Sequence, residues 1–533
     1  MSRLRLVCLG LLIGGAGLVA VHAASASPLR NRLKELRERA EYFERQADWD
    51  KACEIYEAIL RSDRNLPDIR RRYHHSLRRS WQNYRHRDPS FRKEVLGLEY
   101  GQAMRLYNLI QQTLLHESLD KKRVSARSLF RKGLEELRWA LGDPAFLQAH
   151  LSAAKPLEIQ SFQELLAKTW NAMPIGSARE AQRQVREVAL AAHTILGLNA
   201  TTVILELACG ACHALDEHTV YLTPTQFREL CSALKGETVG VGLTLMLHDD
   251  QLVIGEVISG SAAAELMPPL LPGDSVVSID KKPAAQLPAE VAQEMLEGPA
   301  GSAVEIVVQS SVMGMRTVTL RRRAIFTRSV RYQVGTVGYL QITCFHEATL
   351  QELDDALLTL TKAGAKALIL DLRGNGGGIF DVAIDAARRF LPAGVIASLQ
   401  TIDARQNTIY ESKNPDACLL PLVVLVDGDT ASAAEVLAGG LKDNKRARIV
   451  GQSTFGKGCT QSILKLPNTP GGLPTGGIRV TVARFFSPSG QPYSGNGVLP
   501  HILIDRLAML PGMVADDAQL REAHLQAQRL LSR

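Results

Sequence analysis

The chain has 533 residues, of which 46% are hydrophobic, and its 62 basic and 55 acidic residues give a formal net charge of +7. This length and apolar fraction exclude a disordered protein and allow several domains, each with its own core. Eight cysteines are too few to form the disulfide framework of so long a chain. The composition therefore predicts a multidomain globular protein.

Residues 1–26 have the pattern of an export signal. Two arginines precede an apolar run that ends in the small residues Ala24-Ser25-Ala26, the usual form of a cleavage site. The alternative is an uncleaved anchor, because Leu6 to Leu29 contains no Lys, Arg, Asp or Glu and is long enough to span a bilayer. We expect a periplasmic or other extracytoplasmic protein, either free or membrane-anchored.

Residues 27–225 show helical spacing almost throughout. Near their start, residues 38–63 resemble one tetratricopeptide repeat, with small and aromatic residues where two antiparallel helices would pack: Ala40, Trp49, Ala52, Tyr56 and Ile59. A single repeat cannot bury its own faces. We predict a helical hairpin inside a larger all-α region, which offers a surface for an adaptor protein.

Part of the positive charge gathers in one segment of this region, which has no acid between Asp68 and Asp88. Its arginines are Arg70, Arg71, Arg72, Arg78, Arg79, Arg85 and Arg87. Such a run either binds a polyanion or an anionic surface, or is a solvated helical face. We favour the solvated face and expect no nucleic-acid partner.

Cys209, Cys212 and His213 form a Cys-x-x-Cys-His motif, the attachment signature of a c-type haem. The motif lies on a predicted helix, however, and no other segment of the sequence indicates a second haem ligand. A zinc site would lack its usual second pair of ligands. We favour a packed helix with two small thiols, and expect no cofactor and no metal.

From Gly236 the pattern changes to short strands with one helix, near Ala289 to Glu297, which predicts a small β-rich domain over residues 226–323. This segment resembles a PDZ domain. Gly240-Val241-Gly242-Leu243 matches the loop whose N–H groups hold a peptide's terminal carboxylate, and a Pro-Gly-Asp turn follows at the right distance. The resemblance implies that the adjacent strand edge takes up a peptide as an added strand.

Residues 324–505 alternate strands and helices, and residues 506–533 form a predicted helical tail. Continuous apolar runs within 365–374 and 421–429 predict buried parallel strands joined by crossover helices. Ligands of such sheets bind beyond the carboxyl ends of the strands. The glycine-rich segment Arg373 to Gly378 and Ser432 both follow such an end, so we expect a site there.

Ser432 needs a base if it is a nucleophile, and the nearest histidines, His346 and His501, are far along the chain. A lysine can serve when burial lowers its pKa enough to keep the amine neutral. Lys457 is the candidate. Glycines flank it between two predicted strands, so the backbone can approach closely and the amine can point inward.

Ser432, Lys457 and Gln461 have the spacing of the catalytic trio of the carboxyl-terminal processing peptidases, also called tail-specific serine proteases. The chain resembles this family in ordered blocks between Leu205 and Arg506, which are residues 215–227, 370–378, 432–443, 454–461 and 497–505. The helical region before these blocks lies outside the resemblance. Together with its helical spacing, the resemblance implies a multidomain α+β fold: a helical N-terminal region, a PDZ domain, and an α/β crossover-sheet protease core of the crotonase and Clp type.

The resemblance also implies roles for the site residues. Ser432 attacks the scissile carbonyl, neutral Lys457 accepts its proton, and Gln461 orients the amine, by way of an acyl-enzyme. The implied oxyanion donors are the backbone N–H groups of Ala433 and of a glycine in Gly376-Gly377.

Blander explanations exist for some of these residues. Ser432 and Glu435 suit a helix cap, Asp443 suits the end of a helix, and Gln461 suits a solvent-facing strand position.

Three positions depart from the family pattern. Glu297 stands where many members carry an arginine that in some couples substrate capture to activation, so we do not carry that switch over. Gly376 replaces a proline, and His501 replaces an aspartate. The sequence leaves three hypotheses: an exported serine endopeptidase cutting near C-termini or in unstructured segments, a non-catalytic scaffold, and a haem-bearing electron carrier. The intact trio favours the first.

Overall fold

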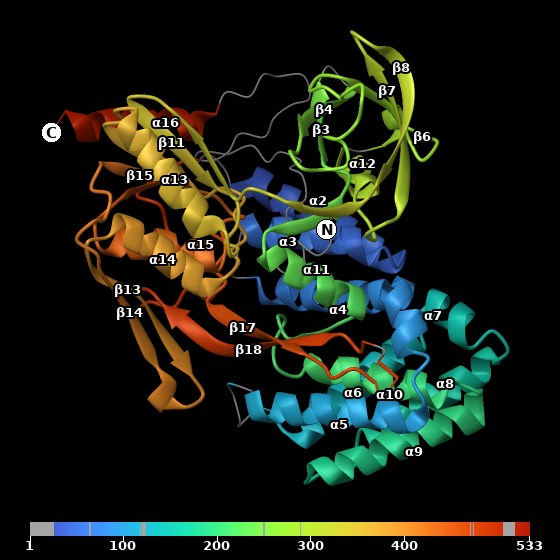
Figure 1. Ribbon diagram of the computed structural model, residues 1–533. Helices are drawn as coiled ribbons and strands as arrows, with labels where there is room; N and C mark the ends of the chain where they lie inside the picture. The colour runs from blue at the N-terminus through green and yellow to red at the C-terminus, as the bar shows by residue number, and fades with distance from the viewer. Residues whose placement is uncertain are drawn as a thin grey trace.

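The computed structural model describes residues 26–504, apart from 63–65, 118, 120–123, 249–250, 288, 470 and 473, together with residues 517–532. A helical region, a PDZ-type domain and an α/β core make up this part of the chain (Figure 1), which confirms the predicted multidomain α+β fold. The predicted export signal lies outside the described residues, apart from Ala26. Within the described ranges, no helix is both long and apolar enough to cross a membrane.

The helical region begins with the predicted hairpin. Its two helices, α2 (Ala26–Arg45) and α3 (Trp49–Ser62), meet through Ala40, Ala52 and Tyr56, which are fully buried, while Trp49 is only partly buried. Small side chains at these positions let the helices approach closely, as the repeat-like pattern predicts. The region continues with α4 (Pro67–Arg87), α5 (Tyr100–Glu117), α6 (Ala126–Ala140), α7 (Pro144–His150), α8 (Pro156–Leu165), α9 (Ala178–Leu196) and α10 (Ala200–Cys212).

The arginine-rich segment forms α4, and neither interpretation of it holds for its two innermost arginines. Arg79 and Arg85 are only 4% and 5% exposed. The Arg79 guanidinium lies 2.7 Å from the Asp143 carboxylate, and the Arg85 guanidinium lies 3.0 Å from Glu206. Ion pairs inside the helical region therefore neutralise these two charges, and neither solvent nor a polyanion reaches them.

The Cys-x-x-Cys-His motif is at the end of α10, and it is buried as a packed helix would be. Cys209, Cys212 and His213 are at most 4% exposed, and the His213 ring stacks on Trp81 with centroids 5.6 Å apart. Gly210 lies so close to α6 that a Cβ on it would collide with Glu136. A haem attached here would have to separate these two helices, so the residues present do not fit that group. All seven described cysteines are free thiols.

The PDZ-type domain is a small sheet with one helix, α12 (Ala289–Leu296). Its strand order is β3-β4-β5-β7-β8, with β6 beside β5, so β3 is an edge strand. The strands are β3 (Leu243–His248), β4 (Gln251–Val257), β5 (Ser275–Ile279), β6 (Lys282–Pro283), β7 (Ala303–Ser310) and β8 (Gly314–Arg321). The chain enters and leaves through β2 (Glu237–Gly240) and β9 (Arg323–Phe326), which pair antiparallel.

The core contains the predicted parallel sheet, in the order β10-β11-β12-β15-β16-β19, with only β10 antiparallel. Along β12, Leu368 and Leu370 face α13, α14 and α15, whereas Ala367 and Ile369 face α16. Burial on both faces explains the continuous apolar runs. The elements are β10 (Val330–Gln333), β11 (Val337–Ile342), β12 (Ala367–Asp371), β15 (Leu422–Val426), β16 (Arg448–Gly451), β19 (Ile502–Leu503), α13 (Thr349–Lys362), α14 (Phe380–Phe390), α15 (Ala433–Asp443) and α16 (Ala518–Leu531).

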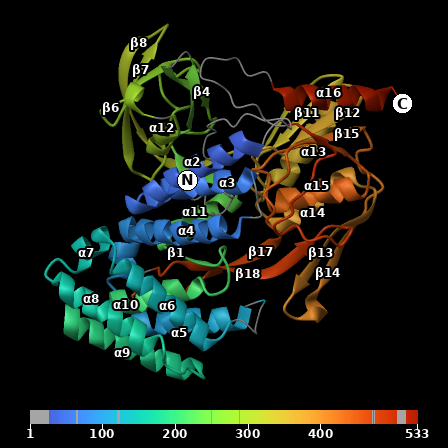
Figure 2. The same cartoon turned by 180° about the vertical axis from the view of Figure 1, so that it is seen from behind.

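A second sheet, which the sequence analysis missed as a unit, joins the core to the helical region. Its order is β1-β18-β13-β14, with β17 also beside β18. Seen from behind, β17 and β18 run from the core between α4 and α6 (Figure 2). Its elements are β1 (Val220–Leu222), β13 (Ala393–Thr401), β14 (Thr408–Lys413), β17 (Cys459–Lys465) and β18 (Gly477–Phe486), and α11 (Pro224–Leu234) follows β1. The helical region is thus built into the core through β1.

Candidate active site

Ser432 is held in an unusual backbone conformation directly before α15. Its φ of +56° and ψ of −117° lie where L side chains rarely go, and holding a residue there costs about 1–3 kcal/mol. For this reason α15 begins at Ala433, directly after Ser432. Strained backbone of this kind occurs mainly at functional sites, where the surrounding structure maintains it.

The turn before Ser432 is fixed by the buried carboxylate of Asp427, which follows β15. One oxygen of Asp427 accepts hydrogen bonds from the N–H groups of Gly374, Asp429 and Thr430, each 3.0 Å long. The Thr430 hydroxyl donates in turn to the carbonyl of Leu372 at 2.9 Å. The segments that follow β12 and β15 are therefore locked together at one edge of the sheet, as predicted.

Two of the predicted oxyanion residues lie beside Ser432. A Cβ on Gly377 would be 3.0 Å from the Ser432 Cβ and 3.1 Å from the backbone nitrogen of Ala433, and the φ of Gly377 is +107°, so no other residue suits this place. The Gly377 N–H, however, donates to the Asn375 side chain at 2.9 Å. Of the two glycines, Gly376 is therefore the better candidate for a donor.

Lys457 lies between β16 and β17 and is 9% exposed. The glycines beside it have the predicted effect. Gly456 has a φ of +87°, and a Cβ on Gly458 would collide with the backbone of Ser494. The backbone can therefore pass close to its neighbours while the lysine side chain is withdrawn from solvent.

Glu435 joins the serine and lysine segments. One of its oxygens accepts hydrogen bonds from the backbone N–H groups of both Ser432, at 2.7 Å, and Lys457, at 2.9 Å. The other accepts from the Thr454 hydroxyl and the Gly456 N–H, both at 2.6 Å. This carboxylate does much more than the capping contact expected of it, because it brings the two predicted catalytic residues together from opposite loops.

The chemical state of Glu435 follows from its surroundings. Complete burial raises the pKa of its carboxyl group to about 7, against the four hydrogen bonds, which lower it. Its ionised form accepts all four donors at once. Protonation would turn one acceptor into a donor and disturb that arrangement.

Gln461 is less exposed than a solvent-facing strand position would be, whereas Asp443 fits its interpretation as the end of a helix. The Gln461 amide nitrogen donates to the Cys459 carbonyl at 3.2 Å and to the Thr481 hydroxyl at 3.5 Å, next to an irregularity in the pairing of β17 with β18. Its role in orienting Lys457 stays a prediction. Asp443, the last residue of α15, accepts from the backbone and hydroxyl of Ser489, which agrees with holding the helix end.

His218 is a residue near the site that the sequence analysis did not single out. Burial lowers its pKa well below the usual value, and positive charge on Lys457, when its amine is protonated, and on Arg479 lowers it further. It therefore lies as a neutral imidazole in the electrostatic reach of Lys457. His218 is far from Ser432 in the chain and belongs to the block of residues 215–227.

The predicted peptide-binding loop has the expected form, but a side chain of the same domain is already hydrogen-bonded to the edge of the adjacent strand, β3. Gly242 has a φ of +86°, and a Cβ there would collide with Ser261. On the free edge of β3, the side chain of Gln293 from α12 donates to the Leu243 carbonyl at 3.0 Å and accepts from the Leu245 N–H at 2.9 Å. These are main-chain groups that an added strand would use. Glu297 lies against Gly240, beside the same loop.

Family comparisons agree with this domain arrangement. Residues 336–504 match the model of peptidase family S41, and residues 232–309 match the PDZ domain model. The first match spans the core sheet from β11 to β19 with Ser432 and Lys457, and the second spans most of the PDZ-type sheet.

Curated relatives match slightly more than half of the chain. A carboxy-terminal-processing protease of Bartonella bacilliformis is 31% identical over 306 residues, which are 56% of this chain and 68% of that protein. A carboxyl-terminal-processing protease of Synechocystis is 34% identical over 302 residues, or 55% and 69% of the two chains. Among solved structures, a photosystem II D1 C-terminal processing protease is 24% identical, with a TM-score of 0.39 over 76% of this chain and 93% of that one.

Proposed function

Because the chain belongs to the family of carboxyl-terminal-processing serine proteases, we propose that it is an exported endopeptidase that cuts proteins near their C-termini or in unstructured segments. Ser432 is the nucleophile and Lys457 is the base. The observation that carries this proposal is the shared carboxylate of Glu435, to which the backbones of both residues are hydrogen-bonded. The strained backbone of Ser432 supports it independently.

The reaction proceeds through an acyl-enzyme. The neutral Lys457 amine takes the proton of the Ser432 hydroxyl while the oxygen attacks the scissile carbonyl, and the resulting ammonium then gives that proton to the departing amine. Water repeats the sequence on the ester and releases the new C-terminus. Lys457 is only 9% exposed, and the cycle requires its amine to be neutral at the start.

The negative oxygen of the tetrahedral intermediate needs aimed N–H donors. We assign the N–H of Ala433, at the start of α15, and that of Gly376, since the N–H of Gly377 donates to Asn375. Gln461 orients the Lys457 amine through its side-chain oxygen, while its nitrogen is held by Cys459 and Thr481. Loss of one oxyanion donor costs about 10²–10³ in rate in such enzymes.

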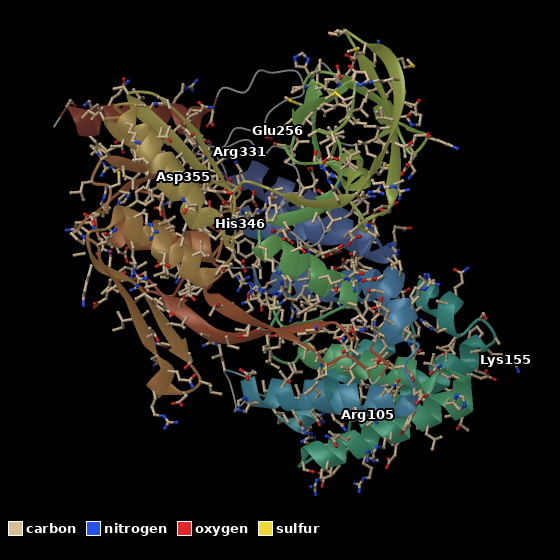
Figure 3. The ribbon with its side chains drawn as sticks, in the orientation of Figure 1. Arg105, Lys155, Glu256, Arg331, His346 and Asp355 are labelled. Atoms are coloured by element: carbon tan, nitrogen blue, oxygen red, sulfur yellow. The ribbon has the colours of Figure 1, made fainter. Side chains whose placement is uncertain are left out.

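The PDZ domain captures the substrate by strand addition to β3, with its carboxylate at Gly240 to Leu243. The incoming strand has to displace Gln293 from the Leu243 and Leu245 main-chain groups. Between the PDZ domain and the core, Arg331 of β10 and Glu256 of β4 lie near each other (Figure 3). Their charged groups are 3.9 Å apart and mostly exposed, so this pair holds the domain only weakly.

Export and the adaptor-binding surface are proposed from sequence patterns. Export rests on the pattern of residues 1–26 alone. An adaptor-binding role for the helical region rests on its repeat-like hairpin. No cofactor takes part in the proposed reaction.

The test is digestion of reduced, unfolded casein by the purified full chain. We expect cleavage that chelators do not inhibit and that both Ser432→Ala and Lys457→Ala abolish. Lys362→Ala, which removes an exposed lysine at the end of α13, serves as the matched control and should cleave normally. A wild-type protein that binds C-terminal peptides but never cuts them would instead support the scaffold hypothesis.

A further inference from the structure

The far end of the helical hairpin reaches the loop that carries the nucleophile. Arg61, in the last turn of α3, places a guanidinium nitrogen 2.6 Å from the carboxylate of Asp429, three residues before Ser432. The Arg61 side chain also passes 3.9 Å from the position that a Cβ on Gly428 would take. Both views of the ribbon place α3 beside the core (Figures 1 and 2).

This ion pair differs from an ordinary surface pair because it is shielded and shared. The side chains of Arg61 and Asp429 are 35% and 21% exposed, and Arg61 also lies 3.2 Å from Glu57, which is 6% exposed. Burial raises the pKa of Glu57 to about 7, where Arg61 opposes the rise and Asp429 adds to it. Without Arg61, two carboxyl groups would be left in one poorly solvated place.

Asp429 is connected directly to the turn that sets the Ser432 conformation. Its N–H donates to the Asp427 carboxylate at 3.0 Å, and the same carboxylate oxygen accepts from Thr430 and Gly374. A shift of Asp429 would therefore displace both the residues that precede Ser432 and the glycine-rich segment. Arg61 links the hairpin to these segments through its ion pair with Asp429.

We propose that Arg61 is a positioning residue for the reaction: it holds Asp429, and through it the turn that keeps Ser432 in its strained conformation. The hairpin of α2 and α3 is then part of the catalytic scaffold, in addition to any partner it binds. This inference rests on the proposed function, since it concerns the same nucleophile.

Helix α4, which follows the hairpin, contacts the segment between α10 and β1 and packs on β1 itself. The Arg78 guanidinium of α4 donates to the His213 carbonyl at 3.1 Å, and His74 lies 3.9 Å from Glu217, the neighbour of His218. Trp81 of α4 packs in one cluster with Val220 and Leu222 of β1. The packing of α4 on β1 thus fixes the helical region against the second sheet, and the hairpin adds the contact between Arg61 and Asp429.

The kinetic test compares variants of the full chain on an unstructured fluorogenic peptide. Arg61→Gln should lower kcat about 10-fold to 100-fold and leave KM within about 2-fold. Arg61→Lys should recover part of that loss, because it retains the charge. The double variant Arg61→Gln with Asp429→Asn should be no worse than the poorer single variant, since both remove one interaction. Arg37→Gln is the matched control, because Arg37 pairs with Asp68 at 2.8 Å in the same helical segment and should keep the wild-type kcat.

A second readout does not depend on activity. In a Ser432→Ala background, hydrogen exchange of the amides of residues 427–431 should be faster in Arg61→Gln and in Asp429→Asn than in Arg37→Gln. If wild-type protein fails to cleave but exchange behaves in this way, the proposed function is wrong while the contact stands. Equal exchange in all three variants, or additive effects of Arg61→Gln and Asp429→Asn on kcat, would overturn the inference.

Discussion

Two fully buried glutamates, Glu206 in the helical region and Glu435 in the core, solve the same problem with different partners. Glu206 accepts hydrogen bonds from Gln82, Arg85 and His86, two of which can carry a positive charge. Glu435 accepts from three backbone N–H groups and one hydroxyl. Burial favours the protonated form of both.

The hydrogen-bonding partners decide whether the pKa of each glutamate is lowered or raised. Burial alone would raise the pKa of Glu206, but the charges of Arg85 and His86 outweigh it and hold the pKa below its usual value. The hydrogen bonds to Glu435 only moderate the effect of burial, and its pKa is raised to about 7. Charged partners thus give a permanent ion pair that joins α4 to α10, whereas backbone partners make the geometry of two loops depend on one carboxylate. We infer that the first glutamate serves stability and the second serves positioning.

The largest expected effect comes from breaking the ion pair. Glu206→Gln leaves the buried Arg85 with too little countercharge, and removal of one partner of such a pair typically costs about 3–5 kcal/mol. The midpoint of thermal unfolding should fall by several degrees, while activity per folded molecule at low temperature should hold. Glu187→Gln, at an exposed position on α9, is the control. An unchanged melting curve for Glu206→Gln would remove the structural half of the comparison.

A second variant addresses the positioning half. Glu435→Gln keeps the shape of the side chain, but its amide N–H₂ faces N–H and O–H groups that donate hydrogen bonds to the carboxylate in the wild type. We expect kcat to fall about 100-fold, because small displacements of reacting groups have effects of this size. Kinetics on the fluorogenic peptide would measure it, alongside circular dichroism to verify the fold. Wild-type kcat in this variant would show that Glu435 is a helix cap and nothing more.

The pH dependence separates the two glutamates with a smaller effect. Lowering the pH from 7 to 6 protonates most of a group whose pKa is about 7, so kcat should fall by up to about 5-fold as Glu435 is neutralised, while Glu206 stays ionised. Stability changes in the opposite sense. Because the folded-state pKa of Glu435 lies above its ordinary 4.5, its contribution is fully present below pH 4.5 and is lost as the pH rises through 7.

Comparing wild type with Glu435→Gln isolates this group. Chemical unfolding from pH 4.5 to 8 should show the wild type losing stability relative to the variant as the pH rises towards 7, and then running parallel to it. A constant difference across the range would contradict the raised pKa.

The sequence predicted elements whose cause is local or periodic. The run Ala367 to Leu370 is apolar on both faces because both are buried, so β12 was identifiable, and Ser432 could then be placed beyond a strand end. The burial of Arg79 was not predictable, because its partner Asp143 is 64 residues away in the chain. The second sheet could not be predicted for the same reason, since β1 pairs with β18 across about half the chain.

The candidate site divides in the same way. The serine and lysine segments were recognisable from spacing and flanking glycines, whereas Glu435 looks like an ordinary cap in the sequence. Its contacts with Thr454, Gly456 and Lys457 appear only when the two loops are folded against each other. His218 and Arg61 were missed because their contacts with the site depend on how the helical region packs on the core.

The most direct test of the account is to trap the acyl-enzyme. A peptide ester is mixed with the protein, the reaction is quenched in acid within milliseconds, and the modified residue is located by tandem mass spectrometry. The account predicts an acyl group on Ser432 that forms about 10³-fold or more slowly in Lys457→Ala. An acyl group on another residue, or equally fast acylation of Ser432 without Lys457, would contradict it.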